Sequence, residues 1–387
     1  MEFIARRWDT GEPVRVTIHN GRWSGFESVA SPHSDRPFLA PAWVDLQING
    51  WSGIELTDPQ LTVERVAAVL QGMDRHGIAR CCPTITTHSF DGMRHSLGTL
   101  ARAIREDETV RDRVCGIHME GPYISPEDGP RGAHPLVHVR SPDWDEFQRL
   151  QDAAEGHIRL VTLSPEYEQA PGFITKLVES GVVVAIGHTA ADSSAIQAAV
   201  DAGASLSTHL GNGAHRTLRR HPNYLWDQLA EDRLTASLIA DGHHLPPGVV
   251  KTFIRAKTVS RTILVSDVVG TAGRPPGRYD DSPLGSVEVL EDGRVVIAGQ
   301  RQLLAGAFRT IEHGVANVMR FAGVGLAEAV EMASLRPARI IGATDYGFRI
   351  GAWADGVLFQ MNGDGSLDIT ATLNRGRLVC GTLPAAE

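Results

Sequence analysis

The chain has 387 residues, of which 42% are hydrophobic, and a formal net charge of -9 at pH 7. This length and composition predict a large hydrophobic core and more than one minimal domain. The acidic balance argues against a nucleic-acid partner, because phosphate backbones require a surface rich in lysine and arginine. The one dense basic stretch, residues 216–221, is either a solvated loop or a local anion site.

No apolar run approaches the roughly 20 residues that a membrane-spanning helix needs. The first seven residues lack the apolar core of a signal peptide. We therefore expect a soluble, cytoplasmic protein without a membrane partner. The cysteines, Cys81, Cys82, Cys115 and Cys380, form neither a disulfide framework nor a Cys-x-x-Cys metal motif.

Both ends of the chain have the pattern of short antiparallel strands. Residues 14–18 alternate before the turn Asn20-Gly21, and similar stretches at 356–359, 368–373 and 377–379 surround a turn at 362–365. Neither end has enough strands for a stable unit alone. We expect residues 1–40 and 346–387 to pair into one small β domain, with residues 41–345 as the main domain.

The main domain alternates apolar strands with amphipathic helices. Helical spacing of apolar residues is seen at 63–73, 144–154, 193–202 and 247–257. Eight strands are predicted, at 43–48, 78–85, 114–119, 158–163, 182–186, 205–208, 235–240 and 262–266. Repeated strand and helix units imply a parallel sheet, and eight of them predict an α/β fold of the (β/α)8 TIM barrel type.

The main structural alternative is a doubly wound open sheet. That fold calls for a glycine-rich phosphate loop after the first strand, and residues 49–53 match such a loop poorly. The barrel is therefore preferred. After the eighth strand we expect a Gly/Pro-rich segment at 270–277, a hairpin around residues 291–293, and helices from about Phe308 and Leu326.

Four chemically active side chains follow predicted strands. Glu120 ends the third strand, and His188, His209 and Asp267 end the fifth, sixth and eighth. A single such histidine is more often an ordinary hydrogen-bonded side chain, and a single acid is often a helix cap. Four at corresponding positions are hard to explain in that way, because the carboxyl ends of barrel strands meet at one face. The set predicts a metal site.

Two imidazoles and one carboxylate are a common set of ligands for catalytic zinc. Glu120, His188 and His209 would then bind the metal, and Asp267 would be free to move a proton as general base and acid. His118 lies on the same side of its strand as Glu120 by alternation, and we expect it to support the ligands rather than join them.

Nine short motifs occur along the chain in a recognisable order. They are Val44-Asp45-Leu46-Gln47-Ile48-Asn49-Gly50, His118-Met119-Glu120-Gly121-Pro122, Gly132-Ala133-His134, Gly187-His188-Thr189, Thr208-His209-Leu210, Ile239-Ala240-Asp241-Gly242, Ser266-Asp267, Leu304-Ala305-Gly306 and Gly351-Ala352-Trp353-Ala354-Asp355. This set and its order resemble those of one known family, the N-acetylglucosamine-6-phosphate deacetylases of the amidohydrolase superfamily.

The resemblance implies a barrel flanked by a β-sandwich built from both termini. It implies hydrolysis of the acetamide of an N-acetyl amino-sugar 6-phosphate, with release of acetate. It also implies roles for individual residues. Glu120, His188 and His209 match the metal ligands, Asp267 the catalytic acid/base, His134 the group that polarises the carbonyl, and Ala133, Asn212, Gly213, His244, Leu304, Ala305 and Gly306 the substrate contacts.

Gln47 and Asn49 occupy the places where many superfamily members have His-x-His and a second metal. Amides bind divalent transition metals weakly, so these positions read as a vestigial second site and predict one metal per subunit. Zinc is the first expectation, with iron, manganese or cobalt as alternatives. The family's phosphate-binding arginine, contributed by the neighbouring subunit, aligns with Arg220, with Arg216 and Arg219 as rivals, and implies a homodimer.

Two departures from the family pattern concern the substrate. After His209 the family commonly reads Phe-Asn-Ala-Met, whereas residues 211–215 of this chain read Gly-Asn-Gly-Ala-His. Trp51 also replaces a small residue in the family's glycine-rich turn. We expect both to lie near the sugar. The alternatives are therefore an amidohydrolase for another N-acyl sugar, an N-acyl amino acid or a cyclic amide lacking phosphate, and, from another class, a catalytically silent barrel scaffold.

Overall fold

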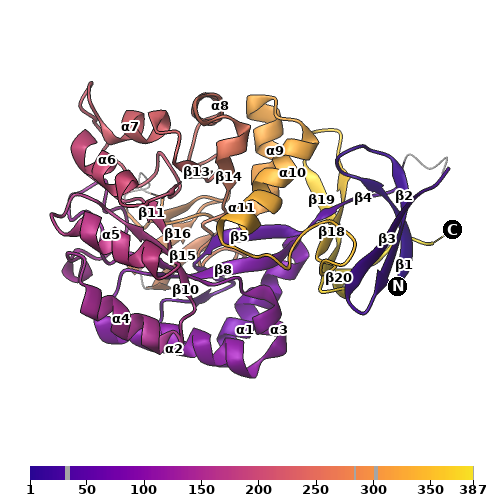
Figure 1. Ribbon diagram of the computed structural model, residues 1–387, viewed down its shortest axis with the longest axis horizontal. Helices are drawn as coiled ribbons and strands as arrows, with labels where there is room; N and C mark the ends of the chain where they lie inside the picture. Colours follow the sequence, from indigo (N-terminus) through magenta and orange to yellow (C-terminus); the bar gives the residue numbers. More distant parts are fainter. Residues whose placement is uncertain (31–34, 283–284, 300–303, 387) are drawn as a thin grey trace.

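The computed structural model describes residues 1–30, 35–282, 285–299 and 304–386, with the side chains of residues 281 and 282 left aside. Eight parallel strands form one sheet (Figure 1). In sheet order they are β5 (Trp43–Ile48), β8 (Ile78–Thr86), β9 (Ile117–Glu120), β10 (Ile158–Leu163), β11 (Val183–Ile186), β12 (Leu206–Ser207), β13 (Thr235–Leu238) and β14 (Thr262–Leu264). A parallel bridge from Ile48 to Val268 joins the first strand to the segment after the last. The predicted (β/α)8 barrel is confirmed.

Helices surround these strands in Figure 1, as expected from their amphipathic sequences. They are α1 (Val63–Gly72), α2 (Phe90–Glu106), α3 (Glu108–Arg113), α4 (Trp144–Ala153), α5 (Ala170–Glu179), α6 (Ser193–Asp201), α7 (Tyr224–Ala230), α8 (Pro247–Lys257), α9 (Ile311–Ala322), α10 (Leu326–Ala333) and α11 (Leu335–Ile340), with 3-10 turns η1 (Met73–His76), η2 (Leu136–His138) and η3 (Val259–Arg261). Several start at a side chain that accepts a backbone hydrogen bond, as Asp143 and Asp192 do for α4 and α6.

Two buried layers hold the barrel together. The larger fills the space between strands and helices and includes Val66, Leu100 and Phe147. The smaller lies inside the barrel and includes Leu46 and Leu160. Because apolar side chains fill the interior, polar chemistry is confined to the ends of the strands.

Strands from both ends of the chain form a single seven-stranded sheet. Its order is β20 (Arg377–Gly381), β19 (Leu367–Asn374), β18 (Gly356–Met361), β4 (Phe38–Pro41), β1 (Glu2–Arg7), β2 (Pro13–His19) and β3 (Arg22–Ser28). Pro41 pairs with Gly356 at the junction, and a bridge from Arg22 to Trp353 brings β3 back over the C-terminal strands. The sheet thus folds over its own core around Trp23 and Leu39. The exact division of the chain at residues 40 and 346 stays a prediction.

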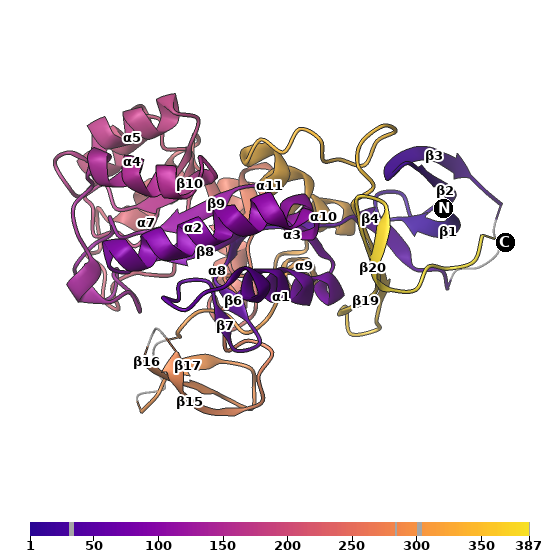
Figure 2. The ribbon, with the colours of Figure 1, turned by 90° about the horizontal axis from the view of Figure 1, so that it is seen from below.

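A smaller sheet projects from the barrel beside the strand ends (Figure 2). It contains β15 (Gly277–Ser282), β16 (Gly285–Val289) and β17 (Val295–Ile297). The expected hairpin at 291–293 joins β16 to β17, whereas β15 was not predicted. A two-residue turn also joins β6 (Gly50–Trp51) to β7 (Ile54–Glu55) directly after the first barrel strand. Among the described residues, no helix is both long enough and apolar enough to cross a membrane.

Two elements begin later than their sequences suggest. β9 starts at Ile117 rather than at residue 114, and Val114 makes only an isolated bridge to Cys81. The ladder is thus interrupted before β9. Helix α9 starts at Ile311, after the cap residue Thr310, rather than at about Phe308.

Candidate active site

A cavity of about 270 Å³ opens at the carboxyl ends of the barrel strands. Its lining comes from loops after seven of the eight strands and from the loop before α9. The lining residues are Asn49, Glu55, Thr57, Thr86, Glu120, Gly129, Gly132, Ala133, His134, Pro135, His188, His209, Gly211, Asn212, Gly213, Ala214, His244, Asp267, Val269, Leu304, Ala305 and Gly306. The predicted strand-end residues therefore share one cavity.

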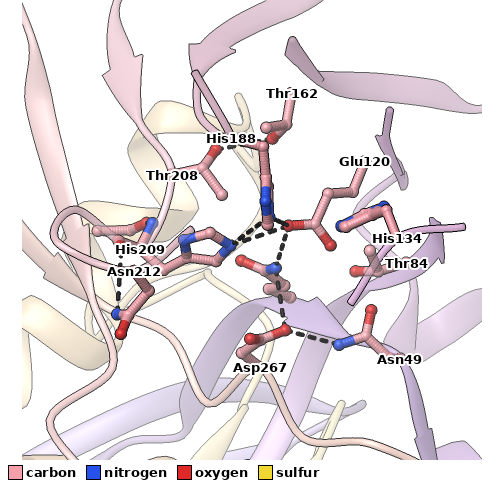
Figure 3. A network of polar contacts seen from close by, with 12 residues as sticks. Asn49, Thr84, Glu120, His134, Thr162, His188, Thr208, His209, Asn212 and Asp267 are labelled. Atoms are coloured by element: carbon pink, nitrogen blue, oxygen red, sulfur yellow. Dashed lines mark hydrogen bonds and ion pairs between the residues drawn. The ribbon is translucent and has the colours of Figure 1, made fainter. Parts of the chain in front are cut away.

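Three donor atoms from three strands converge at its floor (Figure 3). Nε2 of His188 lies 3.2 Å from Oε1 of Glu120, Nε2 of His209 lies 3.0 Å from the same oxygen, and the two nitrogens are 3.1 Å apart. All three side chains are buried. Both histidines have positive φ, 49° and 28°, a sparsely populated conformation that turns each side chain off the end of its strand.

This triangle fits a divalent cation. Donors that share one ion at about 2.0–2.2 Å lie about 3–3.5 Å apart, as these atoms do. The carbonyl oxygen of Pro130, 2.8 Å from Nδ1 of His188, would accept the proton of that nitrogen and leave the lone pair of Nε2 free for a metal. Two imidazole nitrogens and a carboxylate oxygen at these separations are stabilised by a proton or cation that they share.

His134 offers a second combination of donors. Ligand atoms of Glu120, His134 and His188 lie within 4.8 Å of one another. The three pairs in the triangle with His209 are 3.0–3.2 Å apart, and Nδ1 of His134 is 2.8 Å from the hydroxyl oxygen of Thr87. The geometry therefore favours His209 as third donor and leaves His134 facing the cavity beside the metal position.

Burial and neighbouring charge set the protonation states. Burial opposes ionisation of Glu120, but hydrogen bonds from His188 and His209 hold its pKa well below the usual value. Burial lowers the pKa of His134 to about 3 and that of His118 to about 4, so both imidazoles are neutral at physiological pH. His118 contacts the hydroxyl of Thr162 at 2.7 Å and is not part of the cavity lining, as expected of a supporting residue.

Asp267 faces the triangle from the last strand. Burial, helped by the carboxylate of Glu120, raises its pKa to about 6. Its Oδ1 accepts a hydrogen bond from Nδ2 of Asn49 at 2.7 Å (Figure 3). Nε2 of Gln47 donates to the same oxygen at 3.0 Å and to Oε1 of Glu120 at 2.9 Å. The two amides thus present their nitrogens to carboxylates, an arrangement that orients the acids.

Two glycines hold His188 in place. A Cβ on Gly213 would lie 2.6 Å from Nδ1 of His188, and one on Gly132 would lie 3.3 Å from its Cε1. The ring of His134 packs edge-on against the same imidazole, with centroids 4.4 Å apart. The loops after β9 and β12 therefore both pack against one candidate ligand.

Some of the remaining predicted residues line the cavity and others do not. Ala133, Asn212, Gly213, His244 and residues 304–306 line the cavity, and His244 contacts Asp241 through Nδ1 at 2.8 Å. Arg220 does not line it and is exposed on the loop after β12, as are Arg216 and Arg219. The expectation for Trp51 is wrong, because its indole packs against Gly72, Gly273 and His76, outside the cavity lining.

Three polar lining residues were not predicted: Glu55, Thr57 and Thr86. Oε1 of Glu55 accepts a 2.9 Å hydrogen bond from the backbone N–H of Gly270, and burial raises the pKa of this carboxyl to about 8. Thr57 accepts from the N–H of Thr86 at 2.8 Å. The available signal was their position on the active face of a barrel, since Glu55 and Thr57 follow the first strand and Thr86 ends the second.

Comparison with known proteins agrees with this geometry. The sequence model of the amidohydrolase family matches residues 38–379. N-acetylglucosamine-6-phosphate deacetylase of Bos taurus is 33% identical over 352 residues, covering 88% of this chain and 83% of the relative. N-acetylgalactosamine-6-phosphate deacetylase of Escherichia coli O157:H7 is 32% identical, with 81% of each covered. The crystal structure of N-acetyl-D-glucosamine-6-phosphate deacetylase from Mycobacterium smegmatis is 30% identical and superposes with a TM-score of 0.87 over 98% of this chain and 100% of the other.

Proposed function

Since the chain belongs to the N-acetylglucosamine-6-phosphate deacetylase family of amidohydrolases, we propose that it hydrolyses the acetamide of an N-acetyl amino-sugar 6-phosphate. Water replaces the sugar nitrogen on the acyl carbon, and the products are acetate and the free amine. The observation that carries the proposal is the triangle of Glu120, His188 and His209 beside the buried carboxyl of Asp267. N-acetylglucosamine 6-phosphate is the first candidate substrate, and the galactosamine epimer is supported by a relative of similar identity.

Glu120, His188 and His209 are proposed to hold one divalent cation per subunit. When bound, such an ion supplies Lewis-acid chemistry to the amide carbonyl and to water. Zinc suits a set of two imidazoles and one carboxylate, although iron, manganese and cobalt accept the same ligands. Gln47 and Asn49 support a single metal, because their amide nitrogens are committed to carboxylates.

Asp267 is proposed to move the proton. Its carboxylate takes a proton from the attacking water and delivers it to the leaving nitrogen, so that the C–N bond breaks as a neutral amine forms. Hydrogen bonds from Gln47 and Asn49 fix the carboxylate for both steps. His134, neutral and facing the cavity, is placed to donate a hydrogen bond to the carbonyl oxygen, provided that its Nδ1 accepts from Thr87.

The sugar is proposed to lie against Ala133, Asn212, Gly213, His244 and residues 304–306, which line the rest of the cavity. Arg220 is too exposed to serve its own cavity, and we propose that it binds the 6-phosphate in a neighbouring subunit of a homodimer. We place the enzyme in the cytoplasm, which agrees with four free cysteines.

An acetate-release screen tests the proposed reaction. N-acetylglucosamine and N-acetylgalactosamine are each supplied with and without the 6-phosphate, before and after removal of metal by a chelator and its restoration. We expect release from a phosphorylated sugar only, lost with the metal and regained with added zinc. Release of acetate at an equal rate from unphosphorylated sugars would instead favour the second candidate, an N-acyl hydrolase without a phosphate requirement. That second candidate would explain why Arg220 is exposed and why the loop at 211–215 departs from the family pattern.

Mixing two inactive variants tests the shared site. Arg220→Ala and Asp267→Asn are purified separately, then exchanged into mixed dimers by mild dissociation and reassociation. If Arg220 acts on the neighbour, one site of each mixed dimer has both residues, and activity returns. If dimers shown to be mixed recover no activity, Arg220 either acts in the site of its own subunit or lies outside both sites.

A further inference from the structure

A second cavity, of about 120 Å³, lies between helix α9 and the turn that joins β18 to β19, and α9 and β19 are neighbours in Figure 1. Its lining shares no residue with that of the catalytic cavity. A water molecule needs only about 10–15 Å³ of such space, so a polyatomic ion fits. We call this cavity the α9 pocket, and its lining residues are Arg309, His313, Ala316, Asn317, Arg320, Asp364, Gly365 and Ser366.

Basic side chains predominate on the helix side of the α9 pocket. His313 and Arg320 are seven residues apart on α9, which is about two turns, so they share one face of the helix. Arg309 comes just before the first turn and lines the same cavity. Positive groups gathered in this way repel one another, and an anion bound between them relieves the repulsion.

Neutral groups hold both guanidiniums in place. Nη1 of Arg309 donates to the backbone oxygen of Asp241 at 3.3 Å, and Nη2 of Arg320 donates to Oδ1 of Asn317 at 2.7 Å. Cζ of Arg320 also lies 4.8 Å from the ring centroid of Phe321. In the part of the chain that the structure describes, neither arginine forms an ion pair. Since a guanidinium has five N–H donors, most of them are left for water or for a ligand.

The acidic groups near the α9 pocket do not cancel its positive charge. Oδ1 of Asp364 accepts hydrogen bonds from the backbone N–H of Ser366 at 2.9 Å and from its hydroxyl at 2.6 Å. Glu312 is buried, lies 3.5 Å from Nδ1 of His313, and does not line the pocket. Asp364 is therefore the one carboxylate among these described lining residues, and two arginines face it.

One loop separates the α9 pocket from the catalytic cavity. Nδ2 of Asn317 donates to the backbone oxygen of Ala240 at 2.8 Å, next to the bond from Arg309 to Asp241. The carboxylate of Asp241 accepts from the N–H of His244 at 2.9 Å and lies 2.8 Å from its Nδ1, and His244 lines the catalytic cavity. A ligand in the α9 pocket thus lies behind the reaction site and outside it.

We propose that the α9 pocket binds a phosphate group, which is supplied either by inorganic phosphate or by a phosphate monoester. The guanidiniums of Arg309 and Arg320 donate to the phosphate oxygens, because their planar forks suit that ion. His313 adds a third donor from the same helix face when it is protonated. The inference is independent of the proposed function, since no lining residue belongs to the catalytic cavity.

Equilibrium dialysis of the metal-loaded protein against radiolabelled inorganic phosphate tests the proposal. His244→Asn weakens phosphate binding in the catalytic cavity and should retain the phosphate of the α9 pocket. Adding Arg309→Gln and Arg320→Gln to this variant should weaken the retained binding by more than about tenfold, because charge-assisted hydrogen bonds are lost. Arg255→Gln, at an exposed arginine on the neighbouring helix α8 and outside both linings, is the matched control and should change nothing.

A gain of binding guards against loss by misfolding. Asp364→Asn removes the negative charge of an exposed side chain in the α9 pocket, and it should tighten phosphate binding by about twofold to fivefold. Asp368→Asn removes an exposed carboxylate of β19 that is outside the lining, and it should leave the affinity unchanged. Circular dichroism is recorded for every variant.

Unlabelled glucosamine 6-phosphate distinguishes the two sources of the phosphate group. If it displaces the label from His244→Asn, the α9 pocket accepts a phosphate monoester, and if the label stays, the ligand is inorganic phosphate. The proposal is overturned if His244→Asn holds no phosphate that the two arginine substitutions remove. It is overturned as well if Asp364→Asn binds phosphate no more tightly than the wild type.

Discussion

The side-chain nitrogen of Asn49 lies 2.7 Å from Oδ1 of Asp267, and so a residue at the end of the first strand fixes the acid at the end of the last. Replacing Asp267 by asparagine removes the proton carrier but keeps the size of the side chain. We expect kcat to fall by about 10²–10⁴-fold. Metal content should stay at one ion per subunit, because the proposed ligands are untouched.

Elemental analysis and steady-state kinetics on the same sample check both parts of this prediction. Turnover at the wild-type rate would remove Asp267 from the reaction. Loss of the metal would instead show that the carboxylate helps to bind it.

The glycine at position 213 is predicted to be required for the geometry of His188. An added Cβ would lie 2.6 Å from Nδ1 of that ring, at a backbone φ of 55° that side chains rarely adopt. Gly213→Ala should therefore displace the imidazole, weaken metal binding and reduce activity by more than tenfold. Gly248→Ala, where a Cβ meets no atom within 4 Å, should change neither.

Competition with a chelator compares the metal affinities of the two variants. Equal affinities would mean that the loop moves aside, and that the close approach of Gly213 has no functional consequence.

Arg80 links the barrel to the terminal sheet through two acids that differ in burial. It contacts Asp355 at 2.9 Å, where the acid is 1% exposed, and Asp345 at 3.4 Å, where the acid is 41% exposed. Asp355→Asn leaves a buried guanidinium without its main counter-ion and should cost about 3–5 kcal/mol of unfolding free energy. Asp345→Asn should cost less than about 1 kcal/mol, since exposed pairs contribute little. Urea unfolding of the two variants provides the comparison, and similar losses would contradict the assigned roles.

Glu55 should make stability depend on pH. Its pKa of about 8 in the folded protein lies above the value of about 4.3 in an unfolded chain, so folding favours the protonated form. The stabilisation is fully present below about pH 4.3 and is lost as the pH rises toward 8. Between pH 5 and 8 the unfolding free energy of the wild type should fall by at least about 1 kcal/mol more than that of Glu55→Gln, whose side chain does not ionise.

Urea titrations at both pH values measure the difference, since the other ionisable groups are common to the two proteins. Parallel losses in the wild type and the variant would show that Glu55 is ionised in the folded protein at neutral pH.

Much of the active face was predictable from sequence because barrel topology turns a linear pattern into a spatial one. Glu120, His188, His209 and Asp267 follow strands that share a direction, so locating the strands was enough to predict that the side chains meet. The structure brings all four to one cavity. The strand bounds differ by only a few residues, since apolar runs mark them well.

Features that depend on contacts between distant backbones were not predictable. Glu55 reaches the cavity because the hairpin of β6 and β7 docks on the loop after β14, where Gly53 donates to the carbonyl of Gly270. Hydrophobic periodicity carries no information about such a contact. Trp51 was misplaced for the same reason, since its packing against Gly72 and Gly273 is set by that docking. The role of Arg220 depends on a second chain.

The terminal sheet has a consequence for how the molecule is made. β1 to β4 pair with one another, but β4 also pairs with β18 from the far end of the sequence, so that edge of β4 stays unpaired until the ribosome has translated the whole barrel. During that interval an open edge is exposed beside a long nascent chain, a state that favours misassembly. Synthesis that pauses shortly before β18 would therefore yield an assembled catalytic half whose β4 edge is free to join another molecule.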